Sequence, residues 1–147
     1  AAVKPGGEVT VKARYLNTGT VQQDDVIIAI SRPPGCASVV PGTTYVSNKK
    51  TGNRWATTSD MKPSGLNFGS YSPGGAVYVK FNLKIDSIDE IREKCDTTFP
   101  ENGSIWLVPF VQITANTHNG SKGTANNGQD ESRRLLIRVL GPAQPLK

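Results

Sequence analysis

A ten-residue alternation of apolar and polar side chains at residues 76–85 constrains the fold of this chain most strongly. Its apolar positions are Val77, Val79, Phe81, Leu83 and Ile85, and the residues between them are Tyr78, Lys80, Asn82 and Lys84. Successive side chains of a β-strand point to opposite faces, so the pattern predicts a strand with one buried and one solvated face. Residues 9–16 alternate in the same way and predict a second strand of this kind.

Shorter apolar segments bounded by Gly, Pro, Asn and Asp predict five further strands, at 26–30, 43–47, 54–58, 104–114 and 132–140. Residues 86–94 are the one helical candidate, with Asp86 or Ser87 as its N-cap. Residues 115–131 are almost free of apolar side chains and predict a long hairpin loop, and Pro109 predicts a bulge or an edge position. About seven short strands and at most one short helix favour an all-β antiparallel sandwich.

The length of 147 residues suits a single domain. We expect the sandwich to span residues 1–140, followed by a Pro-rich tail or linker at 141–147. Because the first residue is Ala1 and the one methionine is Met61, we also expect a processed or excised chain whose signal peptide has been removed.

The two cysteines, Cys36 and Cys95, lie 59 positions apart and form no C-x-x-C motif. Two cysteines in a secreted domain usually pair, so we predict a Cys36–Cys95 disulfide and an oxidising compartment. Two free buried thiols remain the alternative.

Catalytic chemistry has little support in the sequence. The one histidine, His118, falls in the predicted polar loop, whereas a catalytic histidine needs a nucleophile and an orienting acid held beside it. Acidic segments such as 24–25 and 126–131 lack calcium-loop spacing and are explained by turn formation. We therefore predict no enzyme activity, no cofactor and no metal site.

Two classes of partner are disfavoured. The net charge is +5, but the basic residues are scattered rather than gathered in a stripe, so we expect no nucleic-acid binding. No apolar segment approaches the ~20 residues that cross a bilayer, so we expect no membrane insertion.

Exposed aromatic residues could instead bind surface glycans. Trp55 follows a charged loop and Tyr78 lies on the polar face of the strongest strand, which makes these two the candidates for ligand stacking. Packing against a neighbouring strand or loop is the alternative explanation.

An ordered series of short motifs resembles the conserved-repeat domains of bacterial surface proteins, the type called domain of unknown function eleven. The motifs that carry the resemblance are Lys4–Gly7, Val9–Val11, Leu16–Gly19, Pro33–Gly35, Val40–Asn48, Ser59–Asp60, Gly65–Gly69 and Tyr71–Phe81. The resemblance covers residues 3–85 and continues more weakly to 140. These domains usually carry a strand before the first Pro-Gly turn, where this chain has only residues 1–3. That strand is therefore missing, trimmed or supplied by a neighbouring subunit.

The resemblance implies an immunoglobulin-like sandwich and a non-enzymatic structural or assembly module at a cell or particle surface, such as a fibre, stalk, adhesin or coat subunit. The expected partners are copies of the chain or neighbouring domains, joined by β-strand addition. A carbohydrate-binding module attached to a larger secreted protein is the alternative function.

Overall fold

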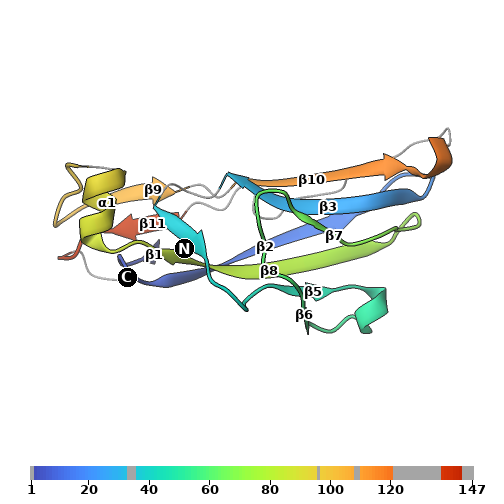
Figure 1. The fold of residues 1–147 in the computed structure, drawn as a ribbon, viewed down its shortest axis with the longest axis horizontal. Helices are drawn as coiled ribbons and strands as arrows, with labels where there is room; N and C mark the ends of the chain where they lie inside the picture. Colours follow the sequence, from blue (N-terminus) through green and yellow to red (C-terminus); the bar gives the residue numbers. More distant parts are fainter. Residues whose placement is uncertain (1, 33–35, 96, 108–109, 121–136, 144–147) are drawn as a thin grey trace.

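The computed structural model describes residues 2–32, 36–95, 97–107, 110–120 and 137–143 (Figure 1). Its eleven strands are β1 (Ala2–Val3), β2 (Glu8–Leu16), β3 (Gln23–Arg32), β4 (Ala37–Val39), β5 (Tyr45–Ser47), β6 (Ala56–Thr57), β7 (Leu66–Asn67), β8 (Ala76–Ile85), β9 (Ser104–Leu107), β10 (Phe110–Thr117) and β11 (Ile137–Leu140). The helices are α1 (Ile88–Lys94) and two 3-10 turns, η1 (Lys49–Thr51) and η2 (His118–Gly120). The predicted all-β sandwich is confirmed.

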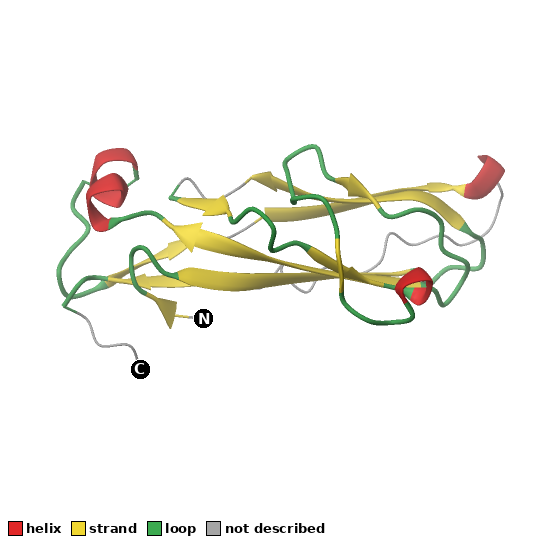
Figure 2. Ribbon diagram, turned by 60° about the horizontal axis from the view of Figure 1, so that its bottom comes forward, coloured by secondary structure: helices red, strands yellow, loops and turns green. Residues whose placement is uncertain are grey.

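The strands form an elongated sandwich of two layers (Figure 2). One layer is a sheet in the order β2-β8-β5-β6, with β4 also paired to β8. The other layer holds two three-stranded sheets, β10-β3-β7 and β1-β11-β9. One pairing departs from the antiparallel expectation, because β1 runs parallel to β11.

The core lies between these layers, as the alternation of β8 predicts. All five apolar side chains of β8 that face inward have no exposed surface, and they belong to one core cluster with buried residues of β3 and β11 such as Ile28, Ile30 and Val139. On β2, Val11, Ala13 and Tyr15 are buried in the same way. The two alternations recognised in the sequence therefore supply the inner face of the two longest strands of one layer.

The structure has more strands than the seven or so predicted, because several strands are only two or three residues long. Strand β7 lies in a segment rich in Gly, Ser and Pro, where a two-residue strand has no periodicity to recognise. The predicted strand at 104–114 is divided into β9 and β10, and Pro109 lies outside the described residues.

Several boundaries differ from the prediction; the strand expected at 26–30, for example, extends over Gln23–Arg32. The loop expected at 115–131 was wrong at its start, since β10 continues to Thr117, which pairs with Gln23 of β3. Backbone pairing with β3 overrides the polar composition there. Of the two predicted N-caps, Ser87 is confirmed, since the Glu90 N–H donates to the Ser87 hydroxyl; the helix itself begins at Ile88. The turn expected at Pro33–Gly35 lies outside the described residues.

The amino-terminal residues do form a strand, although a short one. Ala2 and Val3 pair with Arg138 and Val139 of β11, in the layer opposite β2. At the other end of the chain, the Gly141 N–H donates to the Gly103 carbonyl at 2.9 Å and the Lys4 ammonium donates to the Pro142 carbonyl at 2.8 Å. The first residues of the expected tail are therefore bonded to the sandwich.

Candidate functional site

The solvent-facing side of the β2-β8-β5-β6 sheet, here called the outer face, gathers basic, aromatic and polar side chains. Its members are Glu8, Thr10, Lys12 and Arg14 from β2, Tyr78, Lys80, Asn82 and Lys84 from β8, and Tyr45, Trp55 and Thr57 from or beside β5 and β6. The strand alternation puts these residues on the side opposite the core. The outer face is the strongest candidate for a binding surface.

An aromatic and cationic cluster lies at the centre of this face. The Lys80 ammonium is 4.4 Å from the centroid of the Trp55 ring and 5.6 Å from that of Tyr45. Both contacts are within cation–π range, so they hold the lysine side chain against the rings. Trp55 nevertheless remains 43% exposed.

The two predicted stacking residues share the outer face. Tyr78 is 41% exposed and lies two residues from Lys80 on β8, so its side chain points to the same side as the Trp55–Lys80 contact. A third exposed aromatic residue, Trp106, is 57% exposed but belongs to β9 in the opposite layer. The structure therefore places Trp55 and Tyr78 on one surface and Trp106 on another.

A shallow hollow of about 510 Å³ opens beside the aromatic cluster. Lys12 and Lys80 line it from adjacent strands, together with Thr10, Thr43, Tyr45 and Asn82. In the β2–β8 register, Lys12 is directly opposite Lys80. The hollow is thus lined by two lysines, one aromatic residue, two residues with hydroxyl groups and one with an amide.

The edge of β2 is a second candidate site. Among the strands that the structure describes, β2 pairs with β8 alone. The Ile85 N–H donates to the Gly7 carbonyl, and the Asn17 N–H donates to the Gly75 carbonyl. Hydrogen-bonded pairs alternate along an antiparallel ladder, so the odd-numbered residues of β2 bond to β8. The backbone groups of Thr10 and Lys12 therefore point away from β8, toward the edge.

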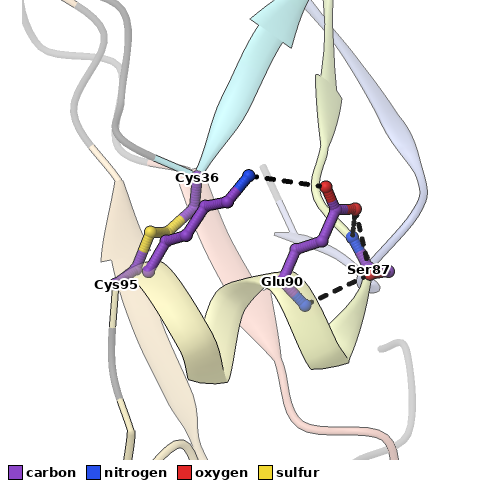
Figure 3. Close-up of a disulfide and its surroundings, with 5 residues drawn as sticks. Cys36, Ser87, Glu90 and Cys95 are labelled. Carbon is purple, nitrogen blue, oxygen red and sulfur yellow. Dashed lines mark hydrogen bonds and ion pairs between the residues drawn. A yellow bond between two sulfur atoms is a disulfide. The ribbon is translucent and has the colours of Figure 1, made fainter.

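The predicted Cys36–Cys95 disulfide is present, with 6.2 Å between the two Cα atoms (Figure 3). Cys36 is buried and precedes β4, whereas Cys95 is exposed at the C-terminal end of α1. At the other end of the helix, hydrogen bonds from the Ser87 backbone and side chain lower the pKa of Glu90. The bridge fixes α1 to the sandwich and indicates a compartment other than the reducing cytoplasm.

An acid–imidazole pair lies far from the aromatic cluster in sequence. Asp24 of β3 contacts the Nδ1 atom of His118 at 2.5 Å. Hydrogen bonds from Gln22, Ser70 and His118 lower the pKa of Asp24 to about 2. The other ring nitrogen of His118 lies 3.0 Å from the side-chain amide of Asn119, which is not a nucleophile. The pair therefore ties η2 to β3.

Sequence reasoning did not identify Lys12, Lys80 and Tyr45 as site residues. Their polar-face positions follow from strand alternation, but their proximity depends on the register of three strands. The Asp24–His118 contact joins residues 94 positions apart and likewise has no local signal.

Within the described ranges, no three His, Cys, Asp or Glu side chains form a group that could hold a metal ion. No described helix is both long and apolar enough to cross a membrane. We find no match to this chain among protein-family models, curated proteins or solved structures.

Proposed function

We propose that this chain is a non-enzymatic structural module of an extracellular surface protein, and that it assembles with further copies by strand addition at the edge of β2. The one-sided pairing of β2 among the described strands carries the proposal. A long sheet edge presents unpaired N–H and C=O groups, which are a template for a strand from another chain.

The composition of β2 suits this role. The strand has nine residues and contains no Pro, and no described strand pairs with the backbone groups of Thr10 and Lys12 at its edge. Proteins that avoid such pairing commonly use short edge strands, Pro or charged side chains at the edge; β2 is long and lacks Pro, and of these features it carries only the charges, on Glu8, Lys12 and Arg14. The Cys36–Cys95 bridge supports an extracellular location, since disulfides persist in oxidising compartments.

The test changes one backbone donor at this edge. Thr10→Pro removes an N–H that points away from β8, so it blocks strand addition without deleting a bond of the β2–β8 ladder. Thr10→Val is the matched control, because it also loses the hydroxyl bond to Asn82 but keeps the N–H. Sedimentation velocity should show concentration-dependent association for the wild type and Thr10→Val, and monomers for Thr10→Pro. A wild type that stays monomeric at all concentrations contradicts the proposal.

A carbohydrate-binding module is the second candidate, favoured by the shared exposure of Trp55 and Tyr78 on the outer face. Flat aromatic side chains with a polar edge suit stacking against sugar rings. A glycan array probed with wild type and Trp55→Ala tests it: binding that disappears in the variant supports the candidate, and an array without binding removes it.

A further inference from the structure

The Lys12–Lys80 pair is the least favourable cross-strand contact on the outer face. Like charges directly opposite each other on antiparallel strands are destabilising. The neighbouring positions of the same ladder carry complementary pairs: Glu8 lies opposite Lys84, and the Thr10 hydroxyl donates to the Asn82 side-chain oxygen at 2.8 Å. The unfavourable pair is thus confined to the position that lines the hollow.

No described carboxylate forms an ion pair with either lysine. The described salt bridges involve Arg92 with Glu101, Lys94 with Glu90, and His118 with Asp24, all away from the hollow. Two acidic side chains contact lining residues of the hollow: Glu8 accepts from Asn82 at 3.2 Å, and Asp60 accepts from the Gly42 N–H at 2.8 Å. An anion bound beside both lysine side chains would offset their like charge.

The wall of the hollow is already ordered by its own hydrogen bonds. The Thr43 hydroxyl donates to the Val40 carbonyl at 2.7 Å and accepts from the Asn82 N–H at 3.0 Å. The rings of Trp55 and Tyr45 hold the Lys80 ammonium in place. A ligand therefore meets groups that need little reordering, which reduces the entropic penalty of binding.

We propose that this hollow binds an acidic polysaccharide, with an anionic group of one sugar between Lys12 and Lys80 and a neighbouring ring against the exposed part of Trp55. The inference deepens the carbohydrate-binding candidate by naming its ligand class, and it is independent of assembly through β2. Two charges beside hydroxyl, amide and aromatic groups match a polymer that carries isolated charges between sugar rings.

A nucleic acid fits this surface less well. Binding to a phosphate backbone uses a stripe of basic residues that follows the strand. Here the charge is local, because Glu8 lies opposite Lys84 at one end of the sheet and Asp60 contacts Gly42 at the rim of the hollow.

The test uses isothermal titration at low ionic strength with four probes: polygalacturonate for carboxylates, dextran sulfate for sulfates, neutral dextran, and single-stranded DNA. We expect at least one acidic polysaccharide to bind. We expect Lys12→Gln or Lys80→Gln to weaken that binding about tenfold, the loss of one charge-assisted contact. Lys62→Gln is the matched control, because it removes the same charge from an exposed position outside the hollow. Comparing the two acidic probes identifies the anionic group.

Four outcomes overturn the inference, and each has a different consequence for the other proposals about the outer face. If Lys62→Gln weakens binding as much as Lys12→Gln or Lys80→Gln, the polymer is attracted by the overall positive charge and not by the hollow. Neutral dextran binding as tightly as the acidic polymers leaves a carbohydrate-binding module but removes its acidic ligand. DNA binding more tightly than either acidic polymer assigns the face to nucleic acid. No binding of any probe by a wild type with a cooperative melting transition removes the hollow as a site and the carbohydrate-binding candidate with it.

Discussion

The two faces of β8 share one backbone but differ in burial and in residue type. The inward side chains are all apolar and have no exposed surface, whereas the outward side chains include Tyr78, 41% exposed, and Lys80, which contacts two aromatic rings. Burial of apolar surface away from water alone explains the residue types of the inner face. The outer face keeps a like-charged pair that burial does not explain. The inward residues of β8 therefore contribute to stability, and the outward residues present polar and aromatic groups to solvent. Each set can be substituted separately.

The largest effect is expected from a matched pair of aromatic substitutions in β8. Phe81→Ala leaves a cavity in the core and should lower the free energy of unfolding by about 3–5 kcal/mol. Tyr78→Ala, on the outer face, should lower it by less than about 1 kcal/mol. Urea unfolding of both variants measures the difference. Similar losses would show that the two faces are not distinct.

Removal of the disulfide should have the next largest effect. The Cys36→Ser/Cys95→Ser double variant frees a crosslink between residues 59 positions apart. Its free energy of unfolding should fall by about 2–4 kcal/mol, because the unfolded chain regains conformational freedom. Binding at the outer face should be unchanged in a folded sample, since neither cysteine lines the hollow. If the folded variant lost binding, the outer face would depend on the disulfide, contrary to this prediction.

High pH should act on the inner face through Tyr15. Burial, with a contribution from Tyr71, raises the pKa of Tyr15 to about 12. The raised pKa means that the neutral phenol is favoured in the folded state. Its contribution to stability is complete below about pH 10, the ordinary tyrosine pKa, and is lost as the pH rises toward 12. Unfolding curves across this range should show the decline, and Tyr15→Phe should reduce it. An unchanged pH dependence in Tyr15→Phe contradicts the assignment.

The smallest expected effect is an increase in stability. Lys12→Glu replaces the like-charged pair with an opposite-charged one and should raise the free energy of unfolding by about 0.2–1 kcal/mol. High salt should reduce this gain. Thermal melting at low and high salt measures it, and Lys62→Glu controls for the change in net charge.

The sequence predicts the inner face well and the outer face poorly, for one physical reason. Period-two alternation depends only on neighbouring residues, so the burial of Val77, Phe81 and Val11 can be predicted directly. The Cys36–Cys95 bridge could be predicted because the chain offers one pairing. The pairing of Lys12 with Lys80 instead depends on strand register, and no local pattern encodes which residues lie opposite each other when they are 68 positions apart.

The central claim is that the outer face binds a ligand at the expense of some stability. Its most direct test measures the melting temperature and the affinity for the better-bound acidic polysaccharide on the same Lys12→Glu protein. The account predicts a melting temperature equal to or above that of the wild type, together with loss of binding. A lower melting temperature, or binding that matches the wild type, would contradict it.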